Sequence, residues 1–304
     1  MIRTSIIKSL AKVRRSKRLI FWYYLWNLGF GILIAFPLYI FLNDQVGKSL
    51  LGESLAQQFD MRVLFELLYY KSSMPAMLRS SLLVFLPMFI IIKLWFSGGT
   101  FSYLLNNTEF SFRTFINDST RFLVRFLRLF IWSIPAFVVV FSIAIGYTLL
   151  TKLALGDLPD ERLIFWNRIV TIALFFGCAM LCNLIFDYAR MHIVANDMSN
   201  MWIAMWRGFT LALRHIGKTV SLYIVIALLG LGVLVIFLGL SLLLTSSHAV
   251  IIALMFLLHQ IYIISRQFIY LLRIGSQAHL FRGLATEAGI RQSVYGYSTV
   301  IDTV

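Results

Sequence analysis

The stretch FDYARMHIVANDMS, residues 186–199, brings Asp187, Arg190, His192 and Asp197 together in a chain with only 13% charged residues. A carboxylate and an imidazole can exchange protons as general acid and base, and Asp187 and Arg190 have the i, i+3 spacing at which side chains pair on a helix. Catalysis would also need a nucleophile with its base, or a metal with its ligands. No HExxH, GxSxG, Walker, paired-cysteine zinc or glycine-rich dinucleotide motif occurs, and the five histidines are scattered. We therefore predict no catalytic residue, no metal, no cofactor and no enzymatic activity.

A second polar group follows in the last apolar segment of the chain. Arg266 and Arg273 are seven residues apart, so a helix presents them on one face, and Gln267 follows Arg266. Ionisable groups inside a membrane are costly and pair with one another. We predict a polar ion-pair site made of Asp187, Arg190, Arg266, Gln267 and Arg273. The alternative is that Arg266 reaches outward to lipid phosphates.

The elements that carry these residues are apolar runs. Hydrophobic residues make up 60% of the chain and the mean hydropathy is +0.84, whereas a soluble domain has about 25% charged residues. A helix needs roughly 17–25 apolar residues to cross a bilayer, and these runs lack the alternation of barrel strands. The predicted fold is an all-α polytopic membrane helix bundle, a single membrane domain over 1–304. Its six transmembrane helices are predicted at 19–42, 78–96, 129–150, 165–186, 220–244 and 249–272.

The charges alternate from one connection to the next. The first 18 residues hold seven Lys and Arg, the connections after spans two, four and six are basic, and the connection after span three is acidic. The positive-inside rule then places both termini in the cytoplasm, with 273–304 as a cytoplasmic tail. Because the formal charge of +14 is distributed in this way, it indicates the phospholipid bilayer as partner, and no nucleic acid.

Basic amphipathic segments precede spans one, three and five, and each predicts a helix on the inner surface, a basic collar and then a span. A shift of 90 residues sets GTFSYLLNN, from Gly99, over ARMHIVAND, from Ala189. Either the chain contains a threefold helix-hairpin repeat, or basic amphipathic segments simply recur at inner interfaces. The predicted contacts with lipid head groups are Arg14, Arg15, Arg18, Arg121, Arg125, Arg128, Arg214 and Lys218.

The segments FDYARMHIVAND and AMWRGFTLALRHIGKTVSLYIV resemble a group of uncharacterised bacterial six-span inner-membrane proteins. These are similar in layout to the membrane domain that accompanies some glycerophosphodiester phosphodiesterases. The resemblance implies a bacterial inner (cytoplasmic) membrane location. The catalytic domain of those phosphodiesterases is missing from this sequence, so the resemblance implies no hydrolysis.

Two functions compete at this point. The first is a non-enzymatic scaffold or accessory subunit that binds anionic lipids with its basic inner segments and serves an unknown membrane protein partner. The second is a transporter or permease component for a lipid or small amphiphile, with Asp187, Arg190, Arg266 and Gln267 lining an inner cavity.

Overall fold

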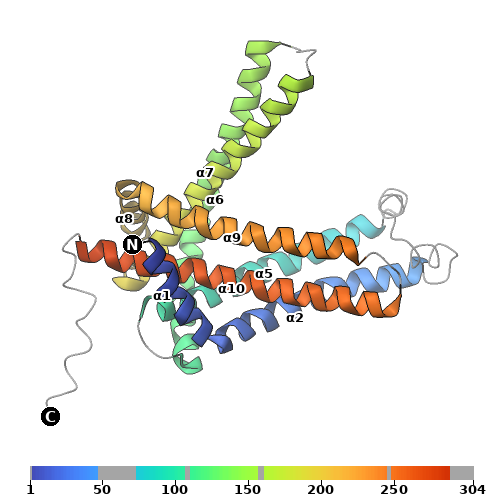
Figure 1. Ribbon diagram of the computed structural model, residues 1–304, viewed down its shortest axis with the longest axis horizontal. Helices are drawn as coiled ribbons and strands as arrows, with labels where there is room; N and C mark the ends of the chain where they lie inside the picture. Colours follow the sequence, from blue (N-terminus) through green and yellow to red (C-terminus); the bar gives the residue numbers. More distant parts are fainter. Residues whose placement is uncertain (1, 47–72, 107–109, 157–160, 245–247, 288–304) are drawn as a thin grey trace. The chain divides into compact units, whose positions relative to one another are not determined.

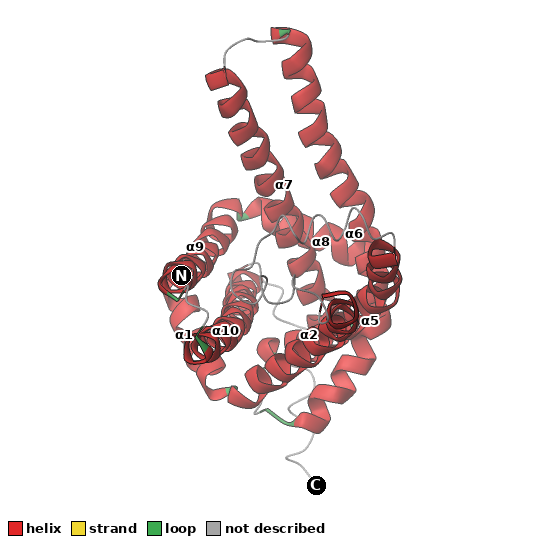
Figure 2. Ribbon diagram, turned by 90° about the vertical axis from the view of Figure 1, so that its right-hand side faces the viewer, coloured by secondary structure: helices red, strands yellow, loops and turns green. Residues whose placement is uncertain are grey.

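The computed structural model describes residues 2–46, 73–106, 110–156, 161–244 and 248–287, and this part of the chain is helical apart from short turns and connections, without strands (Figures 1 and 2). Its helices are α1 (Ile2–Arg15), α2 (Lys17–Val46), α5 (Ser73–Leu105), α6 (Phe112–Leu155), α7 (Glu161–Ala195), α8 (Met201–Arg214), α9 (Ile216–Leu243) and α10 (Ala249–Glu287).

Six of these helices, α2, α5, α6, α7, α9 and α10, are long and apolar enough to cross a membrane. Their large apolar side chains remain exposed along much of their length, as Leu153, Leu242 and Leu243 illustrate with exposed fractions of 84%, 75% and 79%. So much apolar surface is stable only against lipid or another apolar surface. The chain is an integral membrane protein with a helix-bundle fold, which confirms the predicted fold class.

The chain divides into two compact units, and the division runs through α1, α5, α9 and α10. Unit 1 comprises Met1–Leu10, Leu94–Val225 and Arg273–Val304, and unit 2 comprises Ala11–Lys93 and Ile226–Leu272. The first part of the predicted cytoplasmic tail, from residue 273 to Glu287, is helical. There α10 continues, with Ile274 and Leu284 almost fully buried. The buried apolar positions keep the helical spacing, so the helix does not end with the span.

In the described part of unit 2, segments of the membrane-spanning helices α2, α5, α9 and α10 are joined by polar and aromatic contacts. Tyr24 of α2 donates a hydrogen bond of 3.0 Å to the side-chain oxygen of Gln260 in α10. The rings of Phe30 in α2 and Phe89 in α5 lie 5.2 Å apart, and rings of α9 and α10 stack at 4.4 Å. Ring pairs of this kind add stabilisation of about 0.5–1.5 kcal/mol beyond their buried area.

In unit 1, α6 and α7 lie side by side, and α8 packs against α7 (Figures 1 and 2). Small residues permit two close approaches between helix backbones. A Cβ atom on Gly99 of α5 would lie 2.6 Å from the carbonyl oxygen of Phe115 and would also collide with Ser119, both in α6. A Cβ atom on Gly208 of α8 would lie 2.7 Å from the backbone nitrogen of Ala189 in α7. Helices in membrane proteins approach closely through such residues.

A third pair of the same kind joins α10 to α1, because a Cβ atom on Gly275 would lie 3.3 Å from that of Ser9. The three contacts place Gly99, Ala189 and Gly275 in equivalent positions at the ends of spans two, four and six. Their contact partners, Ser119 of α6, Gly208 of α8 and Ser9 of α1, are equivalent to one another in the same way. The threefold repeat stays a prediction; the three contacts give it a register in which Gly99 matches Ala189, as in the alignment predicted from the sequence.

The repeats differ where the surface segment meets the span. In this register Ser16, Phe126 and His215 are equivalent. Ser16 separates α1 from α2, with its hydroxyl donating to the carbonyl of Lys12 at 2.8 Å, and His215 separates α8 from α9. At the middle position Phe126 is fully buried with its ring 5.9 Å from that of Phe101, and α6 runs on as one helix of 44 residues. The prediction of a separate surface helix before span three is therefore wrong.

Candidate functional site

The ends of α5, α7 and α10 meet in unit 1 and carry a nearly continuous run of buried residues. The Arg190 guanidinium of α7 lies 6.0 Å from the centre of the Phe101 ring in α5. The His192 ring of α7 meets that of Phe281 in α10 edge-on, at 4.8 Å between centroids. This junction positions the polar residues of the candidate site.

Asp187 is the centre of the buried ion-pair cluster, with 2% of its surface exposed. Its Oδ1 accepts a hydrogen bond of 3.0 Å from Arg190, and its Oδ2 forms an ion pair of 3.5 Å with Arg273. Arg273 also donates a hydrogen bond of 3.0 Å to the hydroxyl of Tyr223 in α9, and its guanidinium lies 5.4 Å from the centre of that ring. One carboxylate with two guanidinium groups gives a cluster charge of +1, and the contacts connect α7, α9 and α10.

If the predicted threefold repeat is used as a register, the cluster falls at a position that differs between the repeats. Counted from the equivalent small residues, Ser97, Asp187 and Arg273 occupy the same position in the three repeats. Two of these side chains pair with each other, and the third, Ser97, is 4% exposed. Since the α5 end packs with a serine here, an acid and a base are additions specific to the α7 and α10 repeats.

Of the five residues predicted to form the polar site, Asp187, Arg190 and Arg273 lie together. Arg266 and Gln267 belong to unit 2, where Arg266 is exposed and its guanidinium lies 5.9 Å from the centre of the Tyr262 ring one turn away on the same helix. Tyr223 joins the cluster without having been predicted. A single tyrosine in an apolar span carries no signal of its own in a sequence.

Further buried polar groups lie within one turn of the cluster on the same helices. Tyr188 and Gln277 are fully buried, and His192 is 6% exposed. Their hydroxyl, amide and ring nitrogen atoms have no hydrogen-bond partner among the described residues. A buried polar group that is left without any partner costs about 1–3 kcal/mol.

The arrangement can hold helices together by charge. Removing one member of a buried ion pair costs about 3–5 kcal/mol because the other charge is left unpaired. Among the residues that the structure describes, no group of three His, Cys, Asp or Glu side chains could hold a metal ion.

A second ion-pair group lies outside the predicted spans, in the basic collar. This name denotes the eight predicted lipid contacts, Arg14, Arg15, Arg18, Arg121, Arg125, Arg128, Arg214 and Lys218. Asp197, which adopts a left-handed φ of 49° in the turn after α7, pairs with Arg121 and Arg125 of α6 at 2.5 Å each. Burial alone would raise the pKa of Asp197, but the hydrogen bonds from Arg125 and Arg121 outweigh it and lower the pKa from 3.8. Two of the eight predicted lipid contacts are thus engaged by an acid. The other six are exposed: Arg14, Arg15, Arg18, Arg128, Arg214 and Lys218.

No protein-family model, curated protein or solved structure matches this chain. Its functional assignment therefore depends on its own residues and their geometry. The resemblance to bacterial six-span proteins stays a prediction from the sequence.

Proposed function

We propose that this integral membrane protein is a non-enzymatic scaffold or accessory subunit of the bacterial inner membrane that binds anionic lipid through its basic collar. The observation that carries the proposal is the outward face of α8. This helix turns its small residues Ala204, Gly208 and Ala212 into the protein. Its aromatic face stays exposed, with exposed fractions of 57% for Trp202 and 69% for Trp206.

Tryptophan rings beside cationic side chains are typical of helices that lie in the headgroup region. On α8 the exposed tryptophans are accompanied by Arg207 and Arg214, and Lys218 follows in the first turn of α9, all exposed. Each Lys or Arg near an anionic surface contributes about 1 kcal/mol. The tryptophan side chains hold α8 at the depth of the lipid headgroups, and the basic side chains give the preference for anionic lipid.

The composition of unit 1 supports a cytoplasmic location for the collar and the N-terminus. Unit 1 contains the beginning of α1, the basic start of α6 and all of α8, which are the three segments predicted to lie on the inner surface. The positive-inside rule assigns a side rich in Lys and Arg to the cytoplasm.

The transporter alternative required a cavity lined by Asp187, Arg190, Arg266 and Gln267. The pocket beside α5 and α6, described below, is lined by other residues. The carboxylate of Asp187 already pairs with the guanidinium groups of Arg190 and Arg273. The specific observation in favour of the lipid-binding role is the exposed aromatic face of α8.

The test compares two triple variants of the full chain in lipid nanodiscs. Replacing Arg128, Arg214 and Lys218 by Gln removes three exposed collar charges, and replacing Lys152, Arg162 and Arg168 by Gln removes three exposed charges near the connection of α6 with α7. Three collar charges correspond to at most about 3 kcal/mol, or roughly a hundredfold loss of affinity for phosphatidylglycerol at low salt. Native mass spectrometry measures the retained lipid. Equal retention by the two variants would refute the proposal.

A further inference from the structure

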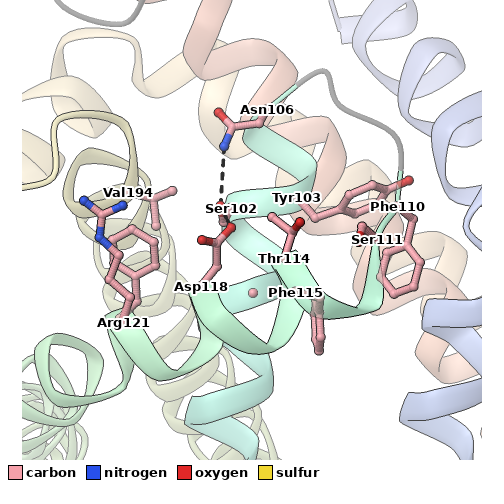
Figure 3. Close-up of a pocket in the computed structure, with 12 residues that line it drawn as sticks. Ser102, Tyr103, Asn106, Phe110, Ser111, Thr114, Phe115, Asp118, Arg121 and Val194 are labelled. Atoms are coloured by element: carbon pink, nitrogen blue, oxygen red, sulfur yellow. Dashed lines mark hydrogen bonds between the residues drawn. The ribbon is translucent and has the colours of Figure 1, made fainter. Parts of the chain in front are cut away.

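A pocket of about 280 Å³ lies between the end of α5 and the beginning of α6 in unit 1 (Figure 3). Pockets for drug-sized ligands measure about 300–1,000 Å³, so this one suits a smaller group. The residues that define its chemistry are Ser102, Tyr103, Asn106, Phe110, Thr114 and Asp118. It therefore combines one carboxylate with hydroxyl, amide and aromatic groups.

Among the described residues that line this pocket, Asp118 alone carries a carboxylate, and it is partly buried. Its Oδ2 accepts a hydrogen bond of 2.5 Å from Ser102, which is 3% exposed, and Asn106 in turn donates to the Ser102 hydroxyl at 3.4 Å (Figure 3). Arg121, one turn further along α6, pairs with Asp197 instead. Among the described residues, Asp118 thus has a hydroxyl partner and no cationic one.

Aromatic rings line another part of the same pocket. The rings of Tyr103 and Phe110 meet edge-on at 5.4 Å, and those of Phe110 and Phe115 lie 5.8 Å apart. A carboxylate attracts an organic cation, and an aromatic ring adds cation–π attraction where its face meets the cation.

The threefold repeat supplies an independent argument. With Ser9, Ser119 and Gly208 in register, the residue before each is Lys8, Asp118 and Arg207. Two repeats carry a base at this position and only the α6 repeat carries an acid. The small-residue contacts form in all three repeats, so the acid is not needed for helix packing.

We propose that this pocket binds a primary ammonium group of an aminoalkyl phosphate, with the ammonium on Asp118 and the phosphate towards Arg121 at the pocket edge. The ligand is either the head group of phosphatidylethanolamine or the free phosphoethanolamine. A primary ammonium donates hydrogen bonds to the carboxylate, whereas the trimethylammonium of phosphatidylcholine has no N–H to donate. The site is separate from the tryptophan face of α8 and does not depend on the anionic-lipid proposal.

The test uses the full chain in detergent with four probes: phosphatidylethanolamine, phosphatidylcholine, phosphatidylglycerol and free phosphoethanolamine. Bound adducts are counted by native mass spectrometry for the wild type, Asp118→Asn and the matched control Glu161→Gln, whose carboxyl is exposed at the start of α7. We expect Asp118→Asn to lose about tenfold or more of the affinity for the ethanolamine probe. Binding of phosphatidylglycerol and the melting temperature should stay as in the control, which excludes misfolding as the cause.

Each probe separates an explanation. Tight binding of the lipid alone, or of free phosphoethanolamine as well, supports the site and identifies its source. Equal affinity of Asp118→Asn and wild type for both ethanolamine probes overturns the proposal. Wild-type affinity for phosphatidylcholine equal to that for phosphatidylethanolamine also overturns it.

Discussion

Replacing Asp187 with Asn tests the buried ion-pair cluster most directly. The substitution keeps the size of the side chain and removes the charge that two guanidinium groups share. Loss of one partner in a fully buried pair costs about 3–5 kcal/mol. The Asp187 side chain is 3% exposed, but those of Arg190 and Arg273 are 20% and 26% exposed, so water compensates part of the loss. We expect unfolding free energy to fall by about 2–4 kcal/mol.

The assay is reversible unfolding of the full chain in mixed micelles, followed by tryptophan fluorescence. Glu161→Gln is the matched control, because it removes an exposed carboxyl at the start of the same helix and should change the stability by less than about 0.5 kcal/mol.

A double-mutant cycle with Arg273→Gln isolates the contact between α7 and α10. Residues in contact give coupling energies of about 0.5–3 kcal/mol, whereas independent sites add within about 0.3–0.5 kcal/mol. We expect coupling above about 1 kcal/mol for Asp187 with Arg273. Additive effects, or an Asp187→Asn variant as stable as the control, would refute the conclusion that the cluster stabilises the contact between α7 and α10.

Two further predictions concern α8 and the turn before it. Gly208→Ala should destabilise the protein by about 1–3 kcal/mol, since the new Cβ meets backbone atoms of α7 at 2.7 and 2.9 Å. Gly217→Ala is the control in the same unfolding assay, because a Cβ atom at Gly217 would have no atom within 4 Å. Equal stability of the two variants would contradict the close approach of α8 to α7. Asp197 has a lowered pKa, so its contribution is present above its ordinary value of 3.8 and is lost as pH falls through the lowered folded pKa. Because its side chain is 48% exposed, the contribution stays below about 1 kcal/mol. The melting-temperature difference between wild type and Asp197→Asn should therefore close as the pH falls below 3.8 and through the lowered pKa of the folded state, and a difference that persists when the carboxyl is protonated would count against the pairing.

Much of the architecture is readable from the amino-acid sequence, because a bilayer requires long apolar helices. The six runs, their helical state and the alternation of basic connections follow from composition and length. The match between Gly99 and Ala189 was also readable, since both begin similar segments at the ends of spans.

The pairing of Asp187 with Arg190 was readable from their spacing, but its partner on α10 was not. Arg266 and Arg273 share a helix face, and seven residues separate them by about 10 Å along the axis. Sequence spacing gives the face but not the depth, so only the tertiary structure selects Arg273. Tyr223 joins the cluster for the same reason, from a span whose sequence marks no polar face.

Which face of α8 packs against α7 was also decided only by the tertiary structure. A helix of a soluble protein buries its large apolar side chains. The beginning of α6 follows the same rule, because Phe115, Phe122 and Phe126 are buried. At α8 the opposite holds: Gly208 lies against the α7 backbone and Trp206 points outward. Where lipid is as apolar as the protein interior, hydrophobicity does not decide which face packs. The sequence therefore determined which helices enter the membrane, and close backbone contact decided how they meet.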